Sequence, residues 1–189
     1  MKKSLVLKIV FVFLFGLYFN AGMNAQLFST GDRMINLGIG VPSYLGGNSY
    51  QTTLPLISGS FDYGVFDGFL ENKAAISVGG YLGYTANRFK LAGNQGYNYV
   101  YLIIGPKATF HYNFIDTWEA YGGLLLGYTA VSSSSYGGVT DQIGKPDNES
   151  RVIPSIFVGA RYYFAYNLAA FAELGYGVSA LGVGLSIKF

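Results

Sequence analysis

The sequence contains a single histidine, His111, and no cysteine, so it offers few residues able to act as a base or a nucleophile. A histidine activates a serine only when the two side chains are within hydrogen-bonding reach. Two positions after His111, on the same face of an extended strand, stands Asn113 rather than serine or aspartate. The sequence also lacks the glycine-rich motifs that bind dinucleotides or nucleotide phosphates. We therefore expect no catalytic residues, no metal site and no cofactor.

Six charged residues share the polar face of segments in which polar and apolar residues alternate. Together with His111 they are Asp62, Lys107, Glu119, Arg161, Glu173 and Lys188. Three are acidic and three are basic, so neighbouring side chains can neutralise one another, as buried charges require. This set could form a path or binding site for protons, ions or a substrate, or it could fill the interior of a small barrel with salt bridges. Because eight strands enclose a space that side chains roughly fill, the filled interior is favoured.

The elements that would hold these side chains are β-strands. From about residue 33 onward, apolar residues occupy every second position; in MINLGIGV, for example, isoleucine, leucine and valine alternate with asparagine and glycine. This two-residue period predicts strands. Eight are expected, at 33–42, 54–65, 75–86, 98–114, 118–131, 152–164, 168–178 and 180–189. Pro106 lies inside the fourth and predicts a missing hydrogen bond or a local distortion there.

The two faces of these strands differ in a way that indicates a membrane. Only 12% of the residues are charged, about half the usual fraction, and the apolar face of each strand carries almost no charge. Lipid requires such a face, and closure into a barrel leaves no unpaired edge. We therefore predict an all-β, eight-stranded, antiparallel up-and-down transmembrane β-barrel. A soluble sandwich would place charges on its outer face, and a propeller would need four strands between successive repeats, where only two fit.

The N-terminus differs from the rest of the chain. Three lysines among the first eight residues accompany an apolar stretch at 9–19, and small residues follow up to Ala25. This order is typical of a cleavable helical signal peptide, so residues 1–25 are expected to be removed and 26–189 to form the barrel domain. The alternative is an uncleaved anchor helix. Loss of the three lysines leaves nine basic and ten acidic residues, a net charge of −1, so no nucleic-acid partner is expected.

A repeated motif suggests how the strands are oriented. The pentapeptide LGYTA occurs twice and a related LGYGV once, each at the same end of every second strand. Their tyrosines, Tyr84, Tyr128 and Tyr176, are expected at the outer lipid boundary, where the ring is buried and the hydroxyl stays in water. An inner aromatic girdle is expected from Phe61, Tyr63, Phe110, Tyr112, Trp118, Tyr162, Phe164 and Phe189. The long connections 42–53, 86–98 and 131–151 would then lie outside and the short turns inside.

With these features the chain resembles the small outer-membrane β-barrel families of Gram-negative bacteria, of the OmpX and OmpA-barrel, porin-like type. The resemblance rests on the signal peptide, the eight alternating segments and the terminal LGVGLSIKF, and it covers residues 26–189. In those families a final strand with alternate apolar residues and a terminal aromatic is recognised by the barrel-assembly machinery. The matching positions are Leu181, Val183, Leu185, Ile187 and Phe189. The glycine- and tyrosine-rich strands also look like barrel proteins of Bacteroidetes.

The resemblance implies an outer-membrane location, with lipid and lipopolysaccharide as surroundings, and leaves three functions open. The first is a structural or surface-interaction barrel with a filled lumen, whose three long connections could bind a surface ligand. The second is a narrow porin-like channel or a conduit for small hydrophobic molecules. The third is a lipid-modifying enzyme. One such enzyme type carries a histidine followed two residues later by serine on the lipid face, a pattern that His111 and Asn113 do not match. We therefore expect the first function and no enzyme activity.

Overall fold

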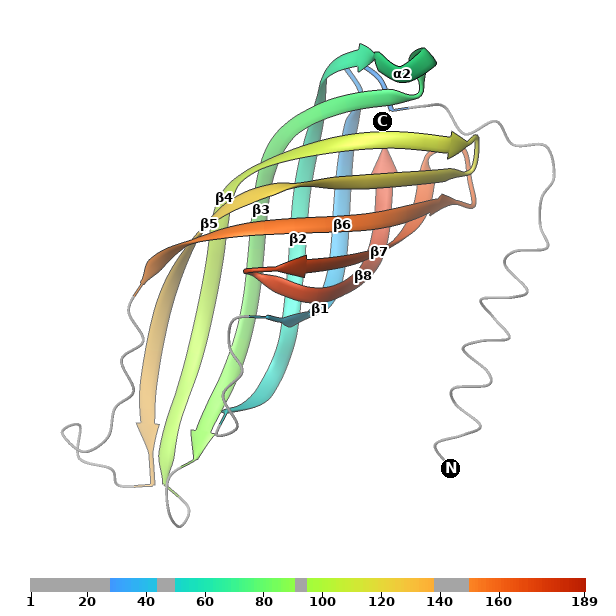
Figure 1. Ribbon diagram of the computed structural model, residues 1–189. Coiled ribbons are helices and arrows are strands. Elements are labelled where there is room, and N and C mark those ends of the chain that lie inside the picture. The colour runs from blue at the N-terminus through green and yellow to red at the C-terminus, as the bar shows by residue number, and fades with distance from the viewer. Residues whose placement is uncertain (1–27, 44–49, 91–94, 138–149) are drawn as a thin grey trace, which may run out of the picture.

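The computed structural model describes residues 28–43, 50–90, 95–137 and 150–189. The expected signal peptide, residues 1–25, lies outside the described residues. Within them, eight strands pair in chain order to form a closed antiparallel barrel (Figure 1). The strands are β1 (Arg33–Pro42), β2 (Tyr50–Gly68), β3 (Ala74–Lys90), β4 (Gly96–Ile115), β5 (Trp118–Tyr136), β6 (Arg151–Tyr163), β7 (Leu168–Tyr176) and β8 (Ser179–Lys188). β8 closes on β1, with Met34 opposite Lys188. The predicted fold class is confirmed.

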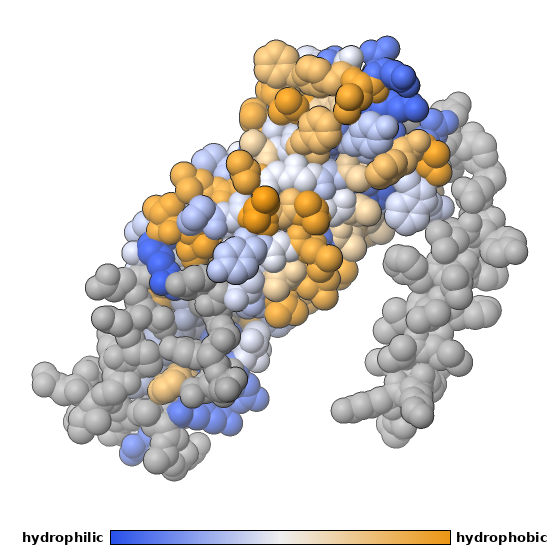
Figure 2. Space-filling model, in the orientation of Figure 1, coloured by the Kyte–Doolittle hydropathy of each residue, from blue (hydrophilic) through white to orange (hydrophobic). Residues whose placement is uncertain are grey.

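The two alternating faces of each strand form the interior and the outer wall of the barrel. In β1, Leu37 and Val41 expose 59% and 56% of their surface, whereas Met34 and Asn36 are buried. Successive side chains of a strand point to opposite faces, so the apolar set covers the outer wall. Figure 2 shows apolar side chains over much of the wall on the face in view. A continuous apolar wall of this kind is stable against lipid, because leaving it in water would cost about 25 cal/mol for each Å².

Several strands are longer than the sequence indicated. β2 begins at Tyr50 rather than residue 54, β3 continues to Lys90 rather than 86, and β5 continues to Tyr136 rather than 131. The connections expected at 42–53, 86–98 and 131–151 are shorter by these amounts. The alternation weakens there because the outer face of residues beyond the lipid meets water, so the hydrogen-bonded ladder continues without an apolar outer face. β1 has the predicted bounds, 33–42.

The long strands give the barrel an uneven rim. β3 and β4 stay paired from Ala74 opposite Tyr112 to Lys90 opposite Gly96, whereas β7 has only nine residues. β2 to β5 therefore project past β6, β7, β8 and β1 as a four-stranded extension, seen in the lower part of Figure 1. Its inner face carries a buried row of tyrosines, Tyr97, Tyr99 and Tyr101.

The connection between β2 and β3 was expected to be longer, at 66–74. β2 instead continues to Gly68, and the turn contains only the short element α2 (Phe69–Asn72) before Lys73. Leu70, Glu71 and Asn72 have φ of 48°, 62° and 64°, so α2 is not a right-handed helix. Gly68 leads into it with φ of 85°, a conformation that glycine adopts without steric cost. In the part of the chain that the structure describes, no helix is long and apolar enough to cross a membrane.

Pro106 produces the interruption that its sequence position predicts. It is exposed on the outer wall. β4 pairs with β5 at Ile104–Tyr128 and again at Lys107–Leu125, in one register, while the described ladder skips Gly105 and Pro106. Because proline has no N–H to donate, the pairing is lost locally without a shift of register.

Candidate functional site: a polar network in the lumen

The predicted polar cluster faces the barrel interior from six strands. Its members are Asp62 on β2, Lys107 and His111 on β4, Glu119 on β5, Arg161 on β6, Glu173 on β7 and Lys188 on β8. All but Glu173, which is half-buried, are at most 6% exposed. Charged groups buried this deeply are costly unless each has partners, so their contacts decide what the cluster can do.

Glu119 and Arg161 form the centre of the network. They are Cα partners across β5 and β6, and the Arg161 guanidinium Nη1 donates to Glu119 Oε1. The hydroxyl of Tyr163 donates to the other carboxylate oxygen at 2.8 Å. His111 Nδ1 lies 2.6 Å from Oε1. The carboxylate is therefore enclosed by three protein groups.

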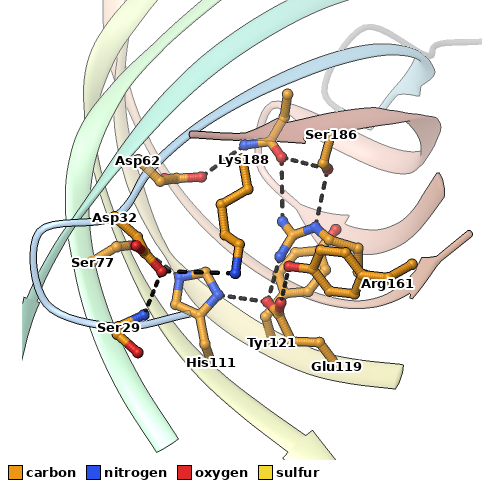
Figure 3. Close-up of polar contacts among 12 residues, drawn as sticks. Ser29, Asp32, Asp62, Ser77, His111, Glu119, Tyr121, Arg161, Ser186 and Lys188 are labelled. Atoms are coloured by element: carbon orange, nitrogen blue, oxygen red, sulfur yellow. Dashed lines mark hydrogen bonds and ion pairs between the residues drawn. The ribbon is translucent and has the colours of Figure 1, made fainter. Parts of the chain in front are cut away.

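The far side of Arg161 is held equally firmly, by residues on β1 and β8 (Figure 3). Nη2 donates to Asn36 Oδ1 at 3.2 Å, and Nε donates to Ser186 Oγ at 3.0 Å. Ser186 in turn donates to Asn36 Oδ1 at 2.7 Å. The guanidinium carbon lies 4.3 Å from the centre of the Tyr121 ring. Arg161 thus ties together strands that lie on different sides of the barrel.

Asn36 connects this centre to a second ion pair. Its amide nitrogen donates to Asp62 Oδ2 at 2.7 Å and to Ser60 Oγ at 3.0 Å. Lys107 Nζ lies 3.3 Å from the same Asp62 oxygen and 4.9 Å from the centre of the Phe157 ring. The charged residues of the network were predicted from the sequence, whereas Asn36, Ser60, Tyr163 and Ser186 were not. The alternation places all four on the inward face, so their strand register is the signal that could have found them.

His111 has a serine partner that the sequence analysis missed. Ser77 Oγ lies 2.8 Å from Nε2, while Nδ1 faces Glu119. Asn113 is the next inward residue on the same strand, as expected, but Ser77 comes from the neighbouring strand β3. The order serine, histidine, carboxylate is that of a hydrolytic triad. Here Ser77 has no exposed surface and the carboxylate is shared with Arg161, so the geometry suits cross-linking of strands rather than attack on a substrate.

The segment before β1 covers one end of the network. Phe28 is 3% exposed and stacks on the His111 ring with a centroid distance of 4.4 Å. The segment is held by backbone hydrogen bonds, Gly31 N–H to Gly64 O and Gly64 N–H to Asp32 O, both 2.9 Å. Asp32 adds a carboxylate 3.8 Å from Lys188 Nζ. Residues 28–32 show no alternation of polar and apolar residues, so their role was not predictable from the sequence pattern.

The aromatic residues predicted to lie at the membrane boundaries project outward. Tyr84, Tyr128 and Tyr176 are 42%, 49% and 76% exposed. In the second set, Phe61, Tyr63, Phe110, Phe164 and Phe189 are exposed, and Tyr112, Trp118 and Tyr162 are half-buried. Leu181, Val183, Leu185 and Ile187 are also exposed on the outer wall, as is Phe189. Their roles as boundary anchors and as an assembly signal remain predictions.

Among the described residues, no group of three or more acidic, histidine or cysteine side chains is arranged to hold a metal ion. What the structure does define is a closed, eight-stranded, up-and-down barrel with an apolar outer wall and a charged interior. This is the architecture of the small outer-membrane β-barrels.

Comparison with solved structures supports this class at the level of the fold. The outer membrane protein OprG from Pseudomonas aeruginosa matches with a TM-score of 0.59 and 12% identity, over 86% of this chain and 98% of that one. Ail, the attachment invasion locus protein of Yersinia pestis, in complex with the heparin analogue sucrose octasulfate, matches with a TM-score of 0.52 and 12% identity, over 85% and 99%. Neither protein-family models nor curated protein sequences give a match. The resemblance to small outer-membrane barrels is confirmed; that to Bacteroidetes proteins has no support.

Proposed function

We propose that the protein is an integral outer-membrane barrel with a closed lumen, and that it serves envelope structure or surface interaction rather than transport or catalysis. The observation that carries this proposal is the enclosed Glu119–Arg161 pair. A path for ions needs polar groups that can exchange partners with water. In this lumen the central groups are bonded to one another instead, and both partners are 1% exposed.

The rim supports the second part of the proposal. β2 to β5 project beyond the rest of the barrel and carry the flanks of the connections 42–53, 86–98 and 131–151. A rigid sheet that presents loops away from a membrane is suited to contact with a surface ligand, because loops on a fixed scaffold commonly carry recognition. Ail is described in complex with a heparin analogue. By analogy, we propose that a surface ligand of this protein binds at the extended rim.

An outer-membrane location also implies lipid and assembly partners. Outer-membrane lipid and lipopolysaccharide would contact the apolar wall, and the barrel-assembly machinery would recognise the alternate apolar residues from Leu181 to Phe189. Exposure of these residues on β8 supports both contacts.

Solute uptake by proteoliposomes tests the closed lumen. Liposomes containing the purified, folded protein should swell in isotonic solutions of small sugars or amino acids no faster than protein-free liposomes, while a general porin included as a positive control swells rapidly. Swelling at a rate comparable to the porin would replace this proposal with the narrow channel.

A further inference from the structure

The polar network leaves one side of the lumen unfilled. A cavity lies between the network and an apolar layer that includes Leu56, Leu125 and Val178. Its volume is about 50 Å³. Glu173 and Lys107 line the cavity on the network side, and the Phe157 and Phe171 side chains also contribute to it. The interior of an eight-stranded barrel can hold one small ligand when side chains do not fill it.

Glycines create this space. Gly182 on β8 lines the cavity and is the Cα partner of both Glu173 on β7 and Gly40 on β1. A Cβ built on Gly182 would have only the Ser179 hydroxyl, at 3.8 Å, within 4 Å. The positions beside the Glu173 carboxylate therefore carry no side chain, although the backbone of Gly182 would accept one.

Glu173 is the acidic member of the network without a basic partner. Asp62 pairs with Lys107, Glu119 with Arg161, and Asp32 with Lys188. Among the described residues, no lysine, arginine or histidine lies within ion-pair distance of Glu173. Its partner is the Tyr121 hydroxyl, which donates to Oε1 at 3.0 Å. Of the carboxylates in and beside the network, Glu173 is therefore the one that faces the cavity without a cationic side chain of the described residues at ion-pair distance.

These features select the charge of a ligand. An anion would meet the Glu173 carboxylate and would have to compete with Asp62 for Lys107. A cation would instead complete an ion pair with Glu173, and a hydrogen bond between ionised groups is about twice as strong as one between neutral groups. Aromatic rings on the cavity wall favour a cation with an organic body, because ring faces attract ammonium groups and pack against carbon. Hard inorganic cations prefer several carboxylate ligands, and among the described residues no group of three or more acidic, histidine or cysteine side chains is arranged to hold a metal ion.

We propose that the cavity binds a small organic ammonium ion, with its charged nitrogen at the Glu173 carboxylate and its carbon chain against Phe157, Phe171 and the apolar layer. This site goes beyond the proposed function, since it requires neither an open lumen nor a partner at the rim.

Titration calorimetry of the folded protein in detergent micelles tests the proposal with n-butylammonium chloride as the probe. Saturable binding is expected, whereas sodium butyrate, which has a similar chain and the opposite charge, should not bind. Glu173→Gln keeps the shape and an acceptor for Tyr121 but removes the charge, and should weaken binding about tenfold or more. Gly182→Leu should abolish binding by filling the space beside Glu173.

Gly80→Leu provides the matched control. Gly80 is an exposed strand glycine, and a Cβ there has no atom within 4 Å. The affinity of the Gly80→Leu variant for n-butylammonium should equal that of the wild-type protein. Heat-dependent electrophoretic mobility shows whether each variant is folded. If the wild type does not bind the probe, or if Glu173→Gln binds it as tightly, the assignment is wrong. Saturable sodium binding with the same dependence on Glu173 and Gly182 would also overturn it, in favour of an inorganic cation site.

Discussion

Glu119 and Arg161 lie directly opposite each other on β5 and β6, and their side chains form an ion pair inside the barrel, where each is 1% exposed. The pair is held from both sides. Tyr163 and His111 contact the carboxylate, while Asn36 and Ser186 contact the guanidinium. Removing either charge would leave the other buried without its ion-pair partner.

Arg161→Leu should therefore destabilise the folded barrel strongly. Loss of one partner of a buried ion pair costs about 3–5 kcal/mol, because the remaining charge stays in a medium that solvates it poorly. The free energy of unfolding, measured by urea titration in lipid vesicles, should fall by that amount. Arg33→Leu, at an exposed position on β1, is the control and should change it by less than about 1 kcal/mol. Equal stability of the two variants would contradict a structural role for Arg161.

The double variant Glu119→Leu/Arg161→Leu should recover much of this loss. Replacing both partners of a buried pair with apolar residues of similar size is often close to neutral. The same urea titration should show a smaller loss for the double variant than for Arg161→Leu alone. If the loss in the double variant instead equalled the sum of the losses in Glu119→Leu and Arg161→Leu, the two side chains would be acting independently.

Ser77 should be chemically unreactive despite its contact with His111. Its hydroxyl is fully buried, and the triad carboxylate is engaged by Arg161. A fluorophosphonate probe, which labels activated serines, should leave the folded protein unmodified by intact mass. Ser77→Ala should lower the free energy of unfolding by about 1 kcal/mol, the usual worth of one hydrogen bond. Stoichiometric labelling that disappears in Ser77→Ala would show a working nucleophile and favour the enzyme alternative.

Phe28 should contribute to stability although it precedes the first strand. Its side chain is buried against Met34, Ala75, Tyr163 and Ala169 and stacks on His111. Phe28→Ala should cost about 3 kcal/mol, within the range for buried aromatic residues. Phe69→Ala, at an exposed position on α2, should cost much less. Similar values for the two variants would show that residues 28–32 do not close the barrel end.

The three repeated tyrosines should share one depth in the membrane. After Trp118→Phe removes the only tryptophan, a single tryptophan can be placed at position 84, 128 or 176 by Tyr→Trp substitution. Brominated lipids should quench all three at one depth near an interface. The native Trp118 should be quenched at a similar distance from the bilayer centre, on the opposite side. Clearly different depths for the three positions would overturn the orientation argued from the repeats.

Much of the fold follows from the period of the sequence, and some of the site does not. The alternation of polar and apolar residues around Leu37 predicts both the first strand and its outer face. The same alternation in the fifth and sixth strands places Glu119 and Arg161 inside the barrel. It fails at Tyr50 and Lys90, where strands continue into water and one face no longer has to be apolar. The partnership of Ser77 with His111 depends on the register between β3 and β4, which the sequence of one strand does not contain. Phe28 and Asp32 lie before the first alternating segment, and their placement depends on tertiary contacts alone.

We propose that the buried network closes the lumen, and single-channel recording in a planar lipid bilayer is a direct test. Wild-type protein should show no stable conductance at modest voltage. Glu119→Ala/Arg161→Ala, which removes the central pair and most of its volume, should show small, steady conductance steps while remaining folded by electrophoretic mobility. Stable wild-type conductance that the double variant leaves unchanged would contradict the claim, because ions would then pass by a route that the network does not block.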